Sequence, residues 1–193
     1  MPLILASGSP IRRKMLEDAA VDHIPVRPDV DEAALKAGKT DAAEIATGLA
    51  RAKAVAVSSL HPGYWVAGSD SVVNVDGRLF DKPRDRDEAA EHLRFFSGKP
   101  LILTSAVALA RDGTIDWSCC DRAELQVRVL SPQFIQAYLD AEWPEVGYCV
   151  GVFRMEGPGI QLFESVEGSY FTILGMPLIP LLGALRKRGI LPS

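Results

Sequence analysis

Short apolar runs of strand length alternate along the chain with longer stretches in which apolar residues recur at helical spacing. The short runs and alternating segments predict strands at residues 3–6, 64–75, 101–110, 115–119, 124–129, 161–165 and 171–174. The helical spacing predicts helices at residues 10–20, 41–58, 85–96, 132–141 and 177–188. Strands and helices interleave, and several strands are separated only by turn residues. We therefore expect an α/β fold, a mixed sheet with flanking helices.

Caps and turns mark the ends of these elements. The Ser-Pro pairs at residues 9–10 and 131–132 each offer a capping hydroxyl, followed by a proline at the first helical position, where its missing N–H costs nothing. The Asp-Gly pair at 76–77 predicts a hairpin turn, and the Ser-Gly pair at 97–98 ends the preceding helix. His92 shares its helix with acidic residues and is expected to face solvent.

Length and charge narrow the class of protein. No linker or repeat divides the 193 residues, so we expect residues 1–193 to form a single domain with two lobes. The 21 Lys and Arg residues are outnumbered by 25 Asp and Glu residues, which disfavours a nucleic-acid partner or a polybasic membrane anchor. No apolar run approaches the roughly 20 residues of a membrane span. The N-terminal apolar stretch lacks a basic region, so it predicts a buried strand rather than a signal peptide.

The cysteines indicate a reducing compartment. Cys119, Cys120 and Cys149 are odd in number and show neither CxxC spacing nor a zinc-site pattern with histidine. We interpret them as small apolar residues and expect the protein in the cytoplasm.

Two arginines follow the first strand and its capped helix start. Ser9 is the expected cap, and Arg12 and Arg13 fall in the first helical turn. Cations there oppose the helix dipole, whereas a bound phosphate would be favoured by both the dipole and the arginines. The alternative is that both arginines are solvated surface residues.

An acid in a β-rich segment is the second candidate. Asp70 lies between small polar residues in an otherwise apolar stretch, where it can accept a proton from water or hold a divalent cation. A turn aspartate satisfied by backbone N–H groups is the alternative. Lys53 and Lys82 suit phosphate oxygens, although each alone is more often a surface charge.

Two further segments carry polar groups suited to a nucleotide. Residues 154–159 are glycine-rich, and Glu156 within them offers acceptors for purine N–H groups. Residues 29–32 hold three carboxylates, a set that can contribute to a Mg²⁺ site or form a solvated acidic loop.

Taken together, these segments resemble the Maf family of nucleoside triphosphate pyrophosphatases. The matching motifs occur in family order: SGSPIRRKML at residues 7–16, DVDE at 29–32, ARAKA at 50–54, GSDSVV at 68–73, DKP at 81–83, FFSGK at 95–99, EGPGI at 156–160 and LGMPL at 174–178. The resemblance implies an elongated two-lobed fold with a central cleft, often in a homodimer. It implies hydrolysis of a nucleoside triphosphate to a monophosphate and pyrophosphate with a divalent metal, Mg²⁺ or Mn²⁺.

By position, Asp70 matches the family's proton acceptor and Glu32 matches an acidic residue near the metal. The phosphate-contacting cations of the family are matched by Arg13, Lys53 and Lys82. The start of the first helix adds Ser9 and Arg12 as expected phosphate-binding residues.

Three positions bear on the substrate's base, namely Ile11, Ser71 and Glu156. Relatives that prefer thymidine and uridine triphosphates have Arg, Thr and Gln there, so this chain looks more like the branch linked to 7-methyl-GTP. Glu also suits the donor edge of guanine. The same reaction on dTTP or UTP is one alternative. A nucleotide-binding regulator of cell division without turnover is the other.

Overall fold

The computed structural model describes residues 2–192, which divide into two compact units. Unit 1 comprises Met1–Ser71, Thr104–Asp121 and Ser169–Ser193, and unit 2 comprises Val72–Leu103 and Arg122–Gly168. Among the residues described, no helix combines the length and apolar character needed to cross a bilayer.

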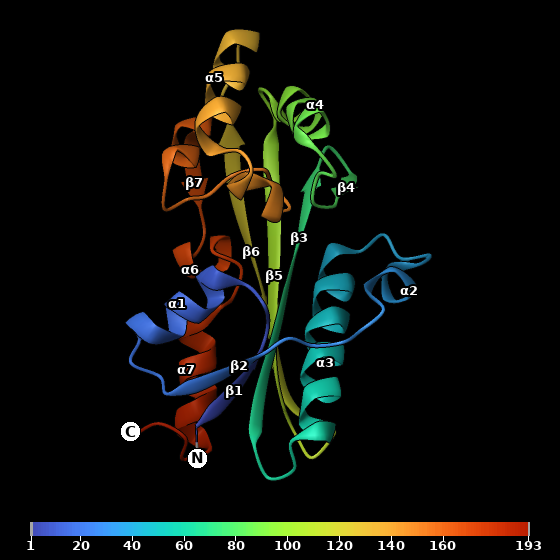
Figure 1. Ribbon diagram of the computed structural model, residues 1–193, viewed down its shortest axis with the longest axis vertical. Coiled ribbons are helices and arrows are strands. Elements are labelled where there is room, and N and C mark those ends of the chain that lie inside the picture. The colour runs from blue at the N-terminus through green and yellow to red at the C-terminus, as the bar shows by residue number, and fades with distance from the viewer. Residues whose placement is uncertain (1, 193) are drawn as a thin grey trace. The chain divides into compact units, whose positions relative to one another are not determined.

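The elements form an α/β fold built on a mixed sheet (Figure 1). The strands are β1 (Leu3–Ala6), β2 (His23–Val26), β3 (Trp65–Val75), β4 (Arg78–Phe80), β5 (Pro100–Arg111), β6 (Thr114–Val127) and β7 (Phe163–Glu167). The α-helices are α1 (Pro10–Asp18), α2 (Glu32–Lys36), α3 (Ala42–Leu60), α4 (Arg86–Phe96), α5 (Pro132–Glu142), α6 (Tyr170–Ile173) and α7 (Leu178–Lys187). The strand order is β2-β1-β3-β5-β6-β7, with β4 on β3. β1 runs parallel to β2 and β3, whereas the β3–β4 and β6–β7 pairs are antiparallel.

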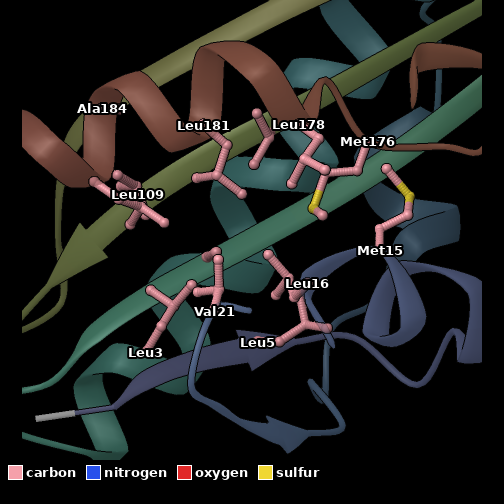
Figure 2. Packing of buried hydrophobic residues seen from close by; sticks show 13 residues of the cluster. Leu3, Leu5, Met15, Leu16, Val21, Leu109, Met176, Leu178, Leu181 and Ala184 are labelled. Carbon is pink, nitrogen blue, oxygen red and sulfur yellow. The ribbon is translucent and has the colours of Figure 1, made fainter. Parts of the chain in front are cut away.

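In unit 1 the first strand is buried on both faces, as expected for a parallel strand covered by helices. Leu3 and Leu5 join the cluster formed with α1 and α7 (Figure 2). Ile4 and Ala6 point the other way and pack with Val57 of α3. This alternation explains why residues 3–6 form a continuous apolar run rather than an alternating one.

Most of the predicted elements are confirmed, and their ends follow the expected signals. Ser9 caps α1 and Ser131 caps α5, each with proline at the start of the helix. Asp76 and Gly77 both adopt positive φ in the β3–β4 hairpin, a conformation that glycine tolerates and aspartate adopts with little cost.

Several predictions were wrong. Residues 115–119 and 124–129 are not separate strands, because β6 runs unbroken through residues 120–123 between them. The stretch 171–174, predicted as a strand, is largely the short helix α6, since periodicity cannot distinguish a short apolar strand from a buried helical turn. The sequence patterns also did not predict β2 and α2, each of at most five residues.

His92 is buried rather than exposed. Its side chain in unit 2 packs edge-on against Phe80, with ring centroids 4.9 Å apart, and the residue is 8% exposed. Among residues 2–192, nothing hydrogen-bonds to its Nδ1. Aromatic packing on the inner face of α4 therefore outweighs the polarity of the ring.

We expect Gly68→Ala to destabilise the protein by about 1–3 kcal/mol, because α3 crosses β3 at this glycine and leaves no room for a methyl group. A Cβ there would lie 2.3 Å from Ala50 O and 2.6 Å from Ala54 N. Urea unfolding followed by circular dichroism measures the change. Gly183→Ala, in α7 with open space around it, serves as the control and should be neutral or stabilising. Equal stability of Gly68→Ala and wild type would contradict the close approach.

We expect acid to destabilise unit 2 through His92. Burial lowers its pKa below the usual 6.5, and nearby Arg78 acts in the same direction, while Glu88, Glu91 and Asp81 oppose the shift. Because the unfolded chain then binds the proton more readily, this contribution is complete above the unfolded pKa and declines as pH falls through it. Unfolding free energies measured between about pH 7.5 and pH 5 should fall less steeply in His92→Leu than in wild type. Parallel pH profiles would refute the assignment.

Candidate functional site

Asp70 lies in unit 1 near the middle of β3, with its side chain 15% exposed. Its Oδ1 accepts a hydrogen bond from the N–H of Ser71 at 2.9 Å, which fixes the carboxylate beside its own strand. Ser69 before it is fully buried and donates through its hydroxyl to Ala106 O of β5 at 2.7 Å. The polar side chains that interrupt the apolar pattern of this strand therefore form hydrogen bonds with neighbouring backbone groups.

Lys53 joins two carboxylates from separate segments. Its Nζ lies 2.7 Å from Glu32 Oε1, at the start of α2, and 3.2 Å from Asp70 Oδ2. The lysine side chain is 9% exposed and projects from α3, which approaches β3 closely at Gly68. The structure thus brings together three residues predicted separately, from a helix, an acidic segment and a strand.

Arg12 is the second cation beside Asp70. One guanidinium nitrogen lies 4.0 Å from Asp70 Oδ1, and the others donate to Gly175 O and Ser69 O, each at 2.9 Å. A further donation reaches Ser71 Oγ at 3.1 Å. Burial lowers the pKa of Arg12, and the negative charges of Asp70 and Glu32 oppose that shift. This fork of donors holds the strand residues around Asp70 in place.

The hydroxyl groups of Ser71 and Ser105 extend the hydrogen bonds of Arg12. Ser71 Oγ lies 2.8 Å from Ser105 Oγ, and Ser105 donates to Thr172 O at 2.8 Å. Gly175, whose carbonyl accepts a hydrogen bond from Arg12, has φ +103°. A Cβ at this position would lie 3.2 Å from Ser71 Oγ. Glycine is therefore required at this turn both for its conformation and for the space.

The remaining predicted residues of α1 lie outside this network. Ser9 accepts from the N–H of Arg12 at 3.5 Å as the helix cap, and Ile11 is partly exposed. Arg13 is half-exposed and pairs with Glu17 at 3.5 Å. Among the described residues, only Arg12 of these two arginines contacts the Asp70 group. Phosphate binding by Ser9, Arg12 and Arg13 stays a prediction.

Unit 2 contains the other two predicted residues, Lys82 and Glu156. Both act electrostatically on the thiol of Cys149, whose pKa is raised to about 11, first by burial and then by the charge of Glu156, while Lys82 and Arg154 lower it. The two side chains therefore share one neighbourhood, although they are 74 positions apart in the chain. This surrounding makes the thiol a poor nucleophile.

Four residues of these hydrogen-bond and ion-pair networks were not predicted from the sequence. In unit 1 these are Ser105 and Gly175, and in unit 2 they are Glu142 and Arg154, which form a two-pronged ion pair. Ser105 had a signal, since it is a hydroxyl in the apolar run 101–110. Glu142 had none, because a glutamate at the end of a helix is usually a surface residue.

Whether Glu32 and Asp70 can bind a divalent metal depends on the groups around their carboxylates. Within residues 2–192, no group of three or more histidine, cysteine or acidic side chains is arranged to hold an ion. Glu32 and Asp70 share Lys53, however, and two carboxylates match what Mg²⁺ uses when phosphate oxygens and water supply its other ligands. The residues present therefore fit a metal that binds together with a phosphate ligand.

Comparison with known proteins gives matches over nearly the whole chain. A family described as Maf-like protein matches residues 2–188. A nucleoside triphosphate pyrophosphatase of Nitrobacter hamburgensis is 45% identical over 192 residues, covering 98% of this chain and 95% of the relative. Two 7-methyl-GTP pyrophosphatases, of Rhizobium etli and Mesorhizobium japonicum, are 43% and 44% identical over 191 residues, each covering 97% of this chain and 96% of the relative. The chain belongs to the Maf family.

Proposed function

We propose that this protein is a nucleoside triphosphate pyrophosphatase that converts 7-methyl-GTP to the monophosphate and pyrophosphate. The observation that carries the reaction is the grouping of Asp70 with two cations, Lys53 and Arg12, in unit 1. Relatives that are 43–45% identical over nearly the whole chain bear the names nucleoside triphosphate pyrophosphatase and 7-methyl-GTP pyrophosphatase.

In the proposed reaction, a water molecule attacks the α-phosphorus while Asp70 accepts its proton. The bond between the α-phosphorus and the bridging oxygen breaks, and pyrophosphate leaves with the electron pair. Lys53 places its ammonium against the triphosphate, and Arg12 holds Asp70 and its strand neighbours in a fixed arrangement. Fixed charges that require no rearrangement during the reaction account for most of the acceleration in such sites.

A divalent cation, Mg²⁺ or Mn²⁺, would be held by Glu32 and Asp70 and would neutralise the phosphate charge. Ser9, Arg13 and Lys82 supply further contacts to the phosphates in this proposed complex. The homodimer and the cytoplasmic location stay predictions.

The proposed base preference rests on Glu156 of unit 2. Methylation at N7 makes the guanine ring cationic, and a carboxylate bonds more strongly to a charged donor edge than to a neutral one. The donors at N1 and N2 alone would not separate 7-methyl-GTP from GTP, because both bases carry them. The negative charge of Glu156 can distinguish 7-methyl-GTP from GTP, because it attracts the cationic ring more strongly than the neutral one. Ile11 and Ser71 belong to the same proposal as specificity residues.

Asp70→Asn should lower turnover by about 10²–10⁴-fold, because asparagine keeps the shape but cannot accept the proton. Pyrophosphate release with excess Mg²⁺ is the measurement, and circular dichroism checks that the variant is folded. Asp18→Asn, which removes an exposed carboxylate of α1 that pairs with Lys14, is the matched control and should retain wild-type turnover. Near-normal turnover of Asp70→Asn would exclude the assigned role. Absence of turnover in the wild type would favour the nucleotide-binding regulator.

Glu156→Gln should reduce the preference for 7-methyl-GTP over GTP by about tenfold, since a neutral amide loses a charge-assisted hydrogen bond. Comparing kcat/KM on 7-methyl-GTP, GTP, UTP and dTTP provides the readout. An unchanged preference would remove Glu156 from the argument. Wild-type kcat/KM values highest on UTP and dTTP would instead support a pyrimidine substrate.

A further inference from the structure

The turn that carries Glu156 is fixed to helix α5 by an ion pair between a buried glutamate and a partly exposed arginine. Arg154 donates from Nε to Glu142 Oε2 at 3.0 Å and from its second terminal nitrogen to Oε1 at 3.1 Å. Glu142 is 5% exposed and the Arg154 side chain 33%. The same terminal nitrogen lies 2.9 Å from Oε2, so both oxygens of Glu142 are in contact with the guanidinium. A two-pronged arginine–carboxylate pair is stronger and more directional than a single hydrogen bond.

The backbone of Arg154 also shapes the turn. Its carbonyl accepts the N–H of Gly157 at 3.3 Å, which closes the turn around Glu156. Gly159 packs directly on the same peptide, since a Cβ there would lie 2.5 Å from Arg154 O. Just before the turn, Tyr138 of α5 donates to Val152 O at 3.1 Å. Arg154 and Glu156 are therefore held as near neighbours.

The two neighbours differ in their partners. Arg154 is neutralised by Glu142, while within residues 2–192 the carboxylate of Glu156 has no hydrogen bond or ion pair. The pKa of Arg154 is raised mainly by its hydrogen bonds to Glu142, and the charge of Glu156 adds to that shift. Arg154 is thus close enough to attract Glu156, but its Nε and one terminal nitrogen are directed to Glu142.

We propose that Glu142 is a specificity-positioning residue: by binding Arg154 in a two-pronged pair, it keeps that guanidinium away from Glu156 and leaves the Glu156 carboxylate free for a cationic base. The inference rests on the proposed function, because it concerns how the same site selects 7-methyl-GTP. Glu142 acts through Arg154 and Glu156 and does not itself touch the nucleotide.

Glu142→Gln is the primary test, because it keeps the side-chain shape but removes the negative charge and one of the two acceptors that hold Arg154. Arg154 then pairs with Glu156, and the kcat/KM preference for 7-methyl-GTP over GTP should fall about tenfold, as in Glu156→Gln. Combining Glu142→Gln with Glu156→Gln should cause no further loss of preference. Asp140→Asn removes an exposed carboxylate from the same helix, one that pairs with Arg86, and should leave the preference unchanged.

The double variant Glu142→Gln/Arg154→Gln separates this role from a merely structural one. Without the arginine, the cation that Glu142→Gln would release towards Glu156 is gone, so the preference should return to within about threefold of wild type. If the ion pair served only the fold, the double variant would be impaired at least as much as Glu142→Gln. That result would overturn the proposal. Should Glu142→Gln fail to fold, the double variant alone decides, since loss of preference in it contradicts the proposal.

A stability cycle tests the same contact without any substrate. Arg154→Gln and Glu156→Gln should have nearly additive effects on the free energy of unfolding in the wild-type background, because the two side chains interact there only through their charges and do not pair. In the Glu142→Gln background their effects should become non-additive, since the pair has formed. Additivity in both backgrounds would overturn the proposal. If the wild type does not prefer 7-methyl-GTP, the proposed substrate fails, and this cycle still decides the role of Glu142.

Discussion

The ammonium of Lys53 organises unit 1, because it binds Glu32 and Asp70 while being almost removed from water. Removing one partner of a buried ion pair costs about 3–5 kcal/mol, so the nearly buried Lys53–Asp70 pair constrains where α3 and β3 meet. The half-exposed Glu32 adds the start of α2 to this contact. The close approach of helix and strand is possible only because residue 68 is glycine. Arg12 extends the arrangement by tying the strand around Asp70 to the turn at Gly175. The fold and the proposed chemistry depend on the same contacts.

Unit 2 uses a related principle with the opposite purpose. In unit 1 the cations are paired with the acid that is proposed to react. In unit 2 the cation Arg154 is paired with Glu142, and Glu156 has no ion pair among the residues described. An ion pair can thus hold a functional carboxylate in position, or leave one free by binding its competitor. In both cases the desolvation of the charged groups is compensated by two or more charge-assisted hydrogen bonds.

Local patterns were enough to predict much of the secondary structure. The strand at 3–6, the hairpin at 76–77 and the helix predicted at 10–20, which ends at Asp18, are determined by burial, capping and the positive φ of the turn. The errors occurred where the local pattern is ambiguous. Residues 115–119 and 124–129 were predicted as two strands, but β6 runs unbroken from Thr114 to Val127. His92 was predicted to be exposed because its sequence neighbours are acidic, whereas its spatial neighbours are aromatic.

The sequence by itself determined the family and a set of candidate side chains, since ordered motifs and residue chemistry are both local properties. Only the tertiary structure decided which of them meet. It placed Lys53 between Glu32 and Asp70, directed Arg12 rather than Arg13 towards Asp70, and paired Arg154 with Glu142. The physical reason is that an ion pair depends on distances of a few ångströms and on exclusion of water. Both are set by how distant segments pack, and neither is encoded in the spacing of residues along the chain.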